Sequence, residues 1–166
     1  MKRFDVMYNK FLLVGPAENE AKVAQSDTIL TAFAKIASVK SIFVSRADDS
    51  GTHKKEIGLW SKAGFISKMF SSDWYREVGS GMGATLNIAA AIGGYTITDS
   101  GTWLNFNNRM NLRVLLGDDP LLFNQYGVIL VSRVRHAHVK SKLGQNFVEW
   151  ILSSNGQKAI NDFKRC

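Results

Sequence analysis

A strand-to-helix turn between residues 41 and 60 constrains the fold of this chain more than any other segment. An apolar run at residues 41–44 is followed by the polar segment 45–53, and residues 54–60 are compatible with a helix. The first turn of a helix has unpaired backbone N–H groups and carries partial positive charge. Anions bind at such turns, so the segment predicts a strand-turn-helix unit with an anion site at its turn.

The turn offers several hydrogen-bond donors to a small oxyanion. Its candidate ligand-binding residues are Ser45, Arg46, Ser50, Gly51 and Thr52. The arginine is a permanent cation with several N–H donors, and the serines and the threonine provide hydroxyl donors. The glycine lets the backbone approach a ligand closely.

A purely local role explains the same residues. Asp48, Asp49 or Ser50 would cap the helix, because short polar side chains accept bonds from the first backbone N–H groups. Arg46 would then pair with one of the two aspartates. The local chemistry alone does not decide between an anion site and a capped helix start.

Length and composition narrow the class of protein. A chain of 166 residues, 45% of them hydrophobic, can bury a core in one or two compact units. Its apolar runs are shorter than the ~18 residues of a membrane span. The first residues lack the apolar core of a secretory signal, so the chain is either cytosolic or has lost a signal. The one cysteine, Cys166, excludes an internal disulfide and a cysteine zinc cluster.

The net charge of +7 raises the question of a nucleic-acid partner. Lysine and arginine are spread along the chain, with small groups at residues 133–142 and 164–165. No finger, basic zipper or aromatic nucleic-acid motif accompanies them. The charge therefore predicts a basic solvated surface and no nucleic-acid partner.

Hydrophobic periodicity predicts an α/β chain. Strands are expected at residues 6–14, 40–45, 95–98, 112–116 and 126–132, and helices at 28–38, 52–64, 84–91, 141–153 and 157–164. Ser26 and Asp27 would cap the first helix. Residues 71–73 would cap a short helix that contains Trp74 and Tyr75.

The helix expected at 141–153 carries an apolar stripe. Its members are Leu143, Phe147, Trp150 and Ile151. Because this spacing places the side chains on one helical face, the stripe predicts a face buried in the core.

Two further turns repeat the pattern of the first. Residues 79–85 form a glycine-rich start to one expected helix, and residues 99–102 follow a strand and precede another. In α/β sheets, ligands bind beyond the carboxyl ends of the strands. If the three turns lie close together in the fold, they form a ligand site. If they lie apart, each is an ordinary helix start.

Catalytic and metal-binding patterns are weak. Ser50 and His53 with a nearby aspartate include the residue types of a hydrolytic triad, but no Gly-x-Ser-x-Gly elbow occurs. His136 and His138 would share a strand face without a third ligand nearby, which favours solvated side chains. The sequence therefore predicts no enzyme activity, no metal site and no cofactor.

Four segments together resemble one protein family. They are FVSRADDSGTHKKE at 43–56, GMGATLN at 81–87, YTITDSGT at 95–102 and LFNQYGVI at 122–129. These segments look like the tungstate-binding substrate proteins of bacterial ABC importers. The similarity extends over nearly the whole chain, and its first segment is highly specific.

The resemblance implies a type II periplasmic-binding-protein fold, in which an oxyanion lies in a cleft between two α/β lobes. Residues 1–16 would be a crossover strand from the first lobe, 17–125 a nearly complete second lobe, and 126–166 the return strand and C-terminal helices of the first lobe. In the family, an arginine and the threonine six residues later contact the anion, which maps onto Arg46 and Thr52. The family also has an N-terminal lobe segment with a Thr/Ser-rich anion-binding motif, and the chain lacks this segment.

The implied function is that of the solute-binding component of an ABC importer. Such a protein binds tungstate or a similar tetrahedral oxyanion, such as molybdate, in the periplasm or elsewhere outside the cytoplasm, and delivers it to a membrane subunit. The alternative is a ligand-sensing effector domain of a transcription regulator with the same fold, although no helix-turn-helix is evident.

The absent lobe segment has a consequence for assembly. Without it, we expect an unpaired sheet edge and exposed apolar helix faces, which soluble monomers tolerate poorly. The chain would then form a homodimer that completes the sheet, or bind a partner that replaces the segment. We also expect the chain to bind its anion more weakly than a complete protein does.

Overall fold

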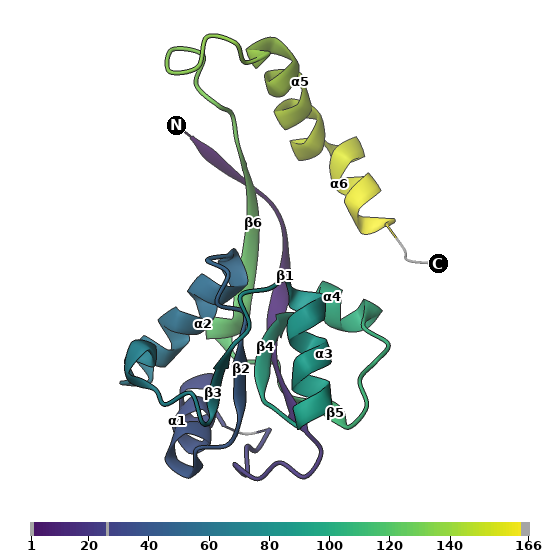
Figure 1. Ribbon diagram of the computed structural model, residues 1–166. Coiled ribbons are helices and arrows are strands. Elements are labelled where there is room, and N and C mark those ends of the chain that lie inside the picture. The colour runs from purple at the N-terminus through teal and green to yellow at the C-terminus, as the bar shows by residue number, and fades with distance from the viewer. Residues whose placement is uncertain (1, 26, 164–166) are drawn as a thin grey trace. The chain divides into compact units, whose positions relative to one another are not determined.

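One long strand, β1 (Arg3–Pro16), contributes residues to both structural units of the chain (Figure 1). The computed structural model describes residues 2–25 and 27–163. Unit 1 combines Met1–Asn9 with Asn124–Cys166, and unit 2 is Lys10–Phe123. The division into lobe segments 1–16, 17–125 and 126–166 stays a prediction.

The sheet of unit 2 is mixed. The antiparallel part has the strand order β4 (Thr96–Asp99), β1, β5 (Leu112–Leu116), with Phe11 opposite Asp99. The parallel part pairs β2 (Phe43–Ser45) with β3 (Tyr75–Glu77). A parallel bridge between Phe43 and Tyr95 joins β2 to the start of β4, so the two parts lie side by side.

Helices cover both faces of this sheet (Figure 1). The helices are α1 (Ile29–Val39), α2 (Gly51–Lys62), α3 (Met82–Ile92) and α4 (Ser100–Asn105), with 3-10 turns at η1 (Ser67–Met69) and η2 (Pro120–Leu122). Phe43 packs in a core cluster with α1 and α2, whereas its neighbour Val44 packs in a second cluster with α3 and α4. Because successive strand side chains point to opposite faces, unit 2 is a three-layer α/β/α structure.

The larger core cluster is aromatic. Trp60 of α2 is fully buried, and its ring lies 4.2 Å from Phe33 of α1 and 5.1 Å from Phe43, centroid to centroid. Tyr75 stacks on Phe43 from β3. These contacts fix α2 against the sheet and therefore fix the turn that precedes it.

Unit 1 contains the first part of β1, the strand β6 (Phe123–Ile129) and two helices. β6 pairs with β1, and α5 (Ser141–Leu152) packs on α6 (Ser154–Asn161). The amide of Gln157 in α6 donates to the carbonyl oxygen of Val6 at 3.1 Å. Ser153 caps α6 by accepting from the backbone N–H of Gly156.

The periodicity predictions are largely confirmed, and the strand at 112–116 agrees residue for residue with β5. Thr28 caps α1, so the prediction of Asp27 as the cap is wrong, and the other predicted cap, Ser26, lies outside the described residues. The last helix, predicted at 157–164, begins and ends three residues earlier, at Ser154 and Asn161.

Two structural predictions are wrong. Trp74 and Tyr75 do not form a short helix, because Tyr75 begins the strand β3 and pairs with Phe43. The stripe on α5 is not a core face: Leu143, Phe147 and Trp150 are 63%, 51% and 49% exposed. A stripe shows that a helix face is apolar, but it does not show that another element covers that face.

No helix among residues 2–25 and 27–163 combines the length and the apolar character needed to cross a membrane.

Candidate functional site

The turn from β2 to α2 has an unusual backbone. Ala47 and Asp49 have φ values of 49° and 56°, in the left-handed region that non-glycine residues rarely adopt. Such conformations persist only where surrounding contacts hold them, and they concentrate at functional sites. The turn therefore has a defined shape that local propensity alone does not explain.

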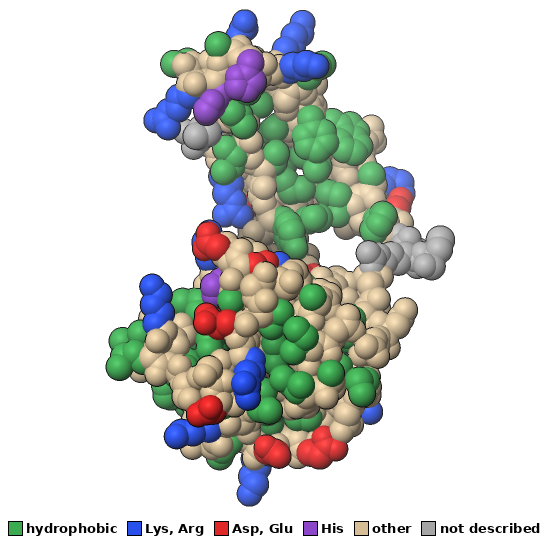
Figure 2. Space-filling view, in the orientation of Figure 1, with side chains coloured by type: hydrophobic (Ala, Val, Ile, Leu, Met, Phe, Trp, Pro, Cys, Tyr) green, Lys and Arg blue, Asp and Glu red, His purple; other side chains and the backbone are tan. Residues whose placement is uncertain are grey.

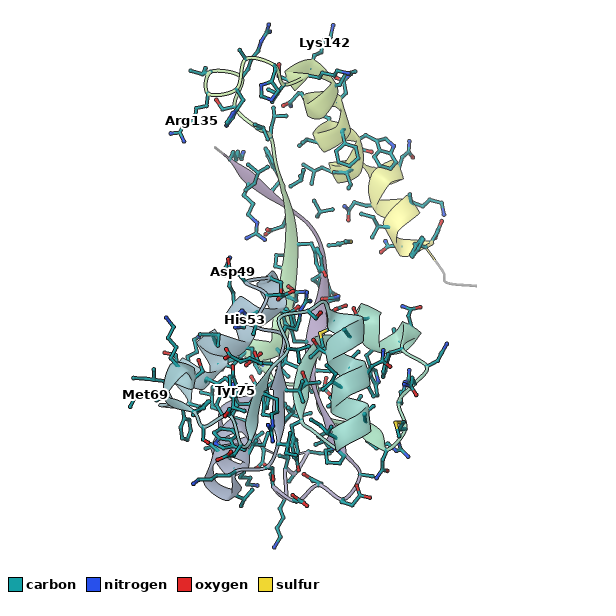
Figure 3. The ribbon with its side chains drawn as sticks, in the orientation of Figure 1. Asp49, His53, Met69, Tyr75, Arg135 and Lys142 are labelled. Atoms are coloured by element: carbon teal, nitrogen blue, oxygen red, sulfur yellow. The ribbon has the colours of Figure 1, made fainter. Side chains whose placement is uncertain are left out.

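Side chains within the turn hold that shape. Ser50 is the N-cap of α2, and its hydroxyl accepts from the backbone N–H of His53 at 3.3 Å. A carboxylate oxygen of Asp48 accepts from the Ser50 backbone N–H at 3.2 Å. The Asp49 backbone N–H donates to Nδ1 of His53 at 3.1 Å, and Figure 3 shows Asp49 and His53 together at the start of α2. The cap predicted for this helix is thus present.

Arg46 pairs with Asp48. A terminal guanidinium nitrogen donates to the Asp48 carboxylate, and the two side chains are 16% and 19% exposed. Hydrogen bonding from Ser50, followed by the bond from Arg46, lowers the pKa of Asp48 to about 2 although partial burial opposes the shift. Asp48 is therefore ionised at neutral pH. Nε of Arg46 is buried and has no hydrogen-bond partner in the described part of the chain.

Ser45 ends β2 and is fully buried. Its hydroxyl donates to Oε2 of Glu56 at 2.8 Å, and the hydroxyl of Tyr75 donates to Oε1 of the same carboxylate at 2.6 Å. In this structure the Ser45 hydroxyl is therefore bonded inside the protein. A direct contact between Ser45 and a ligand stays a prediction.

Glu56 is the residue that the sequence interpretation did not single out. It lies on the buried face of α2 with Leu59 and Trp60, and only 2% of its surface is exposed. Burial raises the pKa of Glu56 to about 7, against the opposing bonds from Tyr75 and Ser45. The sequence spacing could have indicated its burial. Glu56 lies three residues before Leu59 and four before Trp60, and this spacing places all three side chains on one face of the helix.

Gly51 and Thr52 open the helix. A methyl group built on Gly51 would meet nothing within 4 Å, so the space above the first turn of α2 is free. Thr52 is half-buried, and its hydroxyl makes no hydrogen bond within residues 2–25 and 27–163. These two residues therefore leave room and a free donor at the positive end of the helix.

The second predicted turn lies directly beside the first. The backbone N–H of Val78 donates to the Ser45 carbonyl at 3.0 Å, and the backbone N–H of Ser80 donates to the Arg46 carbonyl at 3.1 Å. Gly81, the N-cap of α3, has no side-chain capping bond, and the space above it is open. The starts of α2 and α3 are thus adjacent.

The third turn shares the same edge of the sheet. The hydroxyl of Thr96 in β4 donates to the Val44 carbonyl at 2.7 Å, which fixes β4 beside β2. Asp99 then caps α4 by accepting from the backbone N–H of Thr102 at 2.8 Å and from its hydroxyl at 2.6 Å. The structure therefore brings all three turns to the carboxyl ends of neighbouring parallel strands.

The other candidate patterns do not assemble. The Ser50 hydroxyl accepts from the backbone N–H of His53, and the His53 ring accepts from the backbone N–H of Asp49, so these two side chains are used in the cap and do not form a nucleophile and base pair. The rings of His136 and His138 lie 6.2 Å apart in an exposed loop. The described ranges contain no cluster of three or more His, Cys, Asp or Glu side chains able to hold a metal ion.

Comparison with known proteins identifies the family of this chain. A model of the PBP superfamily domain matches residues 1–155. The tungstate-binding protein TupA of Peptoclostridium acidaminophilum is 41% identical over 165 residues, which are 98% of this chain and 57% of that protein. The chain spans about half to three fifths of the length of the curated relatives that it matches.

Solved structures give the same result. The tungstate-binding protein TupA from Desulfovibrio alaskensis G20 aligns with a TM-score of 0.82 and 41% identity, covering 99% of this chain and 66% of that one. The structure described as the tungstate ABC transporter from Geobacter sulfurreducens aligns with a TM-score of 0.83 and 36% identity, covering 98% and 68%.

Proposed function

The chain belongs to the PBP superfamily, and from this premise we propose that it binds tungstate or a similar tetrahedral oxyanion such as molybdate, as part of a solute-binding protein of an ABC importer. Relatives described as tungstate-binding proteins, at 41% identity over nearly the whole chain, support this ligand. Binding of this kind requires no chemistry on the ligand, so the proposal is for a binding protein and not an enzyme.

The observation that carries the proposal is the adjacency of two helix starts around Arg46. The segment that leads into α3 donates two backbone bonds to the carbonyl groups of Ser45 and Arg46, which lead into α2. Both helix starts present unpaired N–H groups beneath open space at Gly51 and Gly81. Backbone donors of this kind, with positive helix ends, suit a small anion.

The chemistry of the donors favours a fully ionised anion. Arg46, Thr52 and backbone N–H groups only donate, whereas a protonated phosphate would also need an acceptor. The Asp48 carboxylate is engaged by Arg46 and by the Ser50 backbone. An oxyanion at the turn would compete with Asp48 for the Arg46 guanidinium. This competition favours ligands that accept several hydrogen bonds at once.

The proposal extends to a location and to partners. We propose that the protein works outside the cytoplasm, delivers its anion to the membrane subunit of an importer, and self-associates through unit 1. The alternative function, an effector domain of a transcription regulator, shares the fold but lacks support from the 36–41% identical tungstate-binding relatives.

Calorimetric titration with tungstate, molybdate, sulfate and phosphate tests the proposed function. We expect binding of tungstate and molybdate. Arg46→Gln should weaken that binding by about 2–4 kcal/mol, because it removes the charged partner of a desolvated anion. Thr52→Val should cost about 1 kcal/mol, as expected for one neutral hydroxyl.

Arg76 offers a matched control, since it is an exposed arginine on β3. Arg76→Gln removes the same charge from the same unit and should leave the titration unchanged. If Arg46→Gln and Arg76→Gln bind tungstate equally well, Arg46 does not contact the anion.

A further inference from the structure

A buried carboxyl group lies directly behind the proposed anion site. Glu56 projects from α2 to Ser45, the residue before Arg46, with 2.8 Å between Oε2 and the serine hydroxyl. Its other oxygen accepts from Tyr75 of β3 at 2.6 Å. One side chain thus connects the last residue of β2, the helix α2 and the neighbouring strand β3 across the base of the turn.

The hydroxyl groups of Ser45 and Tyr75 each lie within hydrogen-bond distance of one carboxyl oxygen, and both can donate to the carboxylate when it is ionised. The group is 2% exposed and has no cationic partner among its bonds. An ionised carboxylate in such a place is costly because the protein interior solvates charge poorly. When Glu56 is ionised, which its pKa of about 7 allows only above neutral pH, the free protein holds a negative charge next to the site that we propose for an anion.

We propose that Glu56 is the positioning residue of the anion-binding turn, and that it takes up a proton when an oxyanion binds. This inference rests on the proposed function. A dianion at the turn would repel the Glu56 carboxylate through a low-dielectric region, where charges interact strongly. Protonation removes that repulsion, while the carboxyl group still connects Ser45 with Tyr75.

The surroundings place this proton exchange near neutral pH. Burial raises the pKa of Glu56 to about 7, and the negative charge of Glu77 on β3 adds to the shift. Burial also raises the pKa of Tyr75, so its hydroxyl stays protonated and keeps donating. A bound anion would raise the pKa of Glu56 further, because it disfavours the ionised form.

The other elements packed against α2 supply no competing partner for Glu56. α1 contributes the buried apolar side chains of Ile29, Ala32, Phe33 and Ile36. On β4, the carboxylate of Asp99 is bonded to Thr102. Lys68 of η1 is exposed. The charges that act on Glu56 therefore come from β3 and from the turn itself, where Arg46 and Asp48 neutralise each other.

Calorimetry of tungstate binding in buffers of different ionisation enthalpy measures the protons taken up. Near pH ~7.5 we expect uptake of up to one proton per anion bound. Affinity should fall about tenfold between pH ~6 and pH ~8.5 for each pKa unit by which the anion shifts Glu56. In Glu56→Gln, both the proton uptake and the pH dependence should disappear, and the affinity at high pH should rise towards that of the wild type at low pH.

Two controls separate Glu56 from its neighbours. Glu77→Gln makes the same change at an exposed position on β3, and His53→Gln removes the imidazole that accepts from the Asp49 backbone N–H at the turn. Both should retain proton uptake. Tyr75→Phe removes one donor to the carboxylate and should move the pH midpoint of affinity upwards, which gives a second readout if Glu56→Gln fails to fold.

Different results would contradict the role of Glu56 and the proposed oxyanion binding. Tungstate binding without proton uptake, or uptake that persists in Glu56→Gln, would overturn the role of Glu56 and leave the proposed function standing. No binding of any tested oxyanion at any pH would overturn the proposed function, and the inference with it.

Discussion

At the scale of the residue, a substitution at Gly51 would affect the stability of the fold and the affinity for the ligand differently. Its backbone is not in the left-handed region, and an added methyl group would meet no atom within 4 Å. Alanine is also the better helix former. The structure of the free protein therefore does not require glycine at this position, and contact between Gly51 and a ligand stays a prediction.

We predict that Gly51→Ala leaves the free energy of unfolding unchanged or up to about 1 kcal/mol higher, and weakens tungstate binding at least tenfold because the methyl group occupies the space above the first turn of α2. Urea unfolding and titration calorimetry measure the two effects. Gly58→Ala, at an equally open position within α2, is the control. Full affinity in Gly51→Ala would place the anion elsewhere.

Glu56 should also make stability depend on pH. Its pKa rises from an ordinary value of 4.5 in the unfolded chain to about 7 in the fold. Between these values the folded protein binds more protons than the unfolded chain, so stability decreases as pH increases. The contribution is fully present below pH ~4.5 and is lost above pH ~7, a decrease of about 3 kcal/mol.

This expectation is tested by urea unfolding of the wild type and Glu56→Gln at pH ~5 and pH ~8. The wild type should lose stability relative to the variant as pH rises, because the variant has no group to deprotonate. Parallel pH profiles of the two proteins would show that Glu56 titrates alike in the folded and unfolded states.

At the scale of the element, the sequence indicated the strands and helices wherever a run was long enough to show its period. β5 agrees at both ends, and α3 begins two residues before its predicted start because Gly81 provides the cap. The three-residue strand β3 could not be found in this way. The Ser71 hydroxyl accepts from the backbone N–H of Asp73 as a cap would, but the pairing of Tyr75 with Phe43 determines the structure that follows.

The sequence indicated the turn and its residue types, but it did not indicate the hydrogen bonds that these residues make within the protein. Hydroxyl, glycine and arginine residues after a strand indicated the turn, and the resemblance indicated Arg46 and Thr52. The left-handed backbone of Ala47 and the bond from Ser45 to Glu56 depend on packing between separate elements. Glu56 was missed because a glutamate is expected at the surface unless a partner compensates its burial.

At the scale of the whole molecule, unit 1 differs from unit 2 in how its apolar side chains are covered. Figure 2 shows hydrophobic side chains gathered on the helical part of unit 1, and those of α5 include Leu143, Phe147 and Trp150, all about half exposed or more. A hollow of about 250 Å³ between residues 128–131 and α5 is lined mainly by apolar side chains. Exposed apolar side chains that gather on one face favour an interaction site there.

We therefore predict that the chain self-associates through the α5 face. Light scattering over a range of protein concentrations should show mass increasing with concentration, since burial of apolar surface drives association. Replacing Phe147 and Trp150 with serine should shift the protein towards the monomer. Replacing Met69 and Leu104 of unit 2, which are 79% and 74% exposed, removes comparable apolar surface elsewhere and should leave association unchanged. A monomer at every concentration would show that the exposed face of α5 is stable in water without a partner.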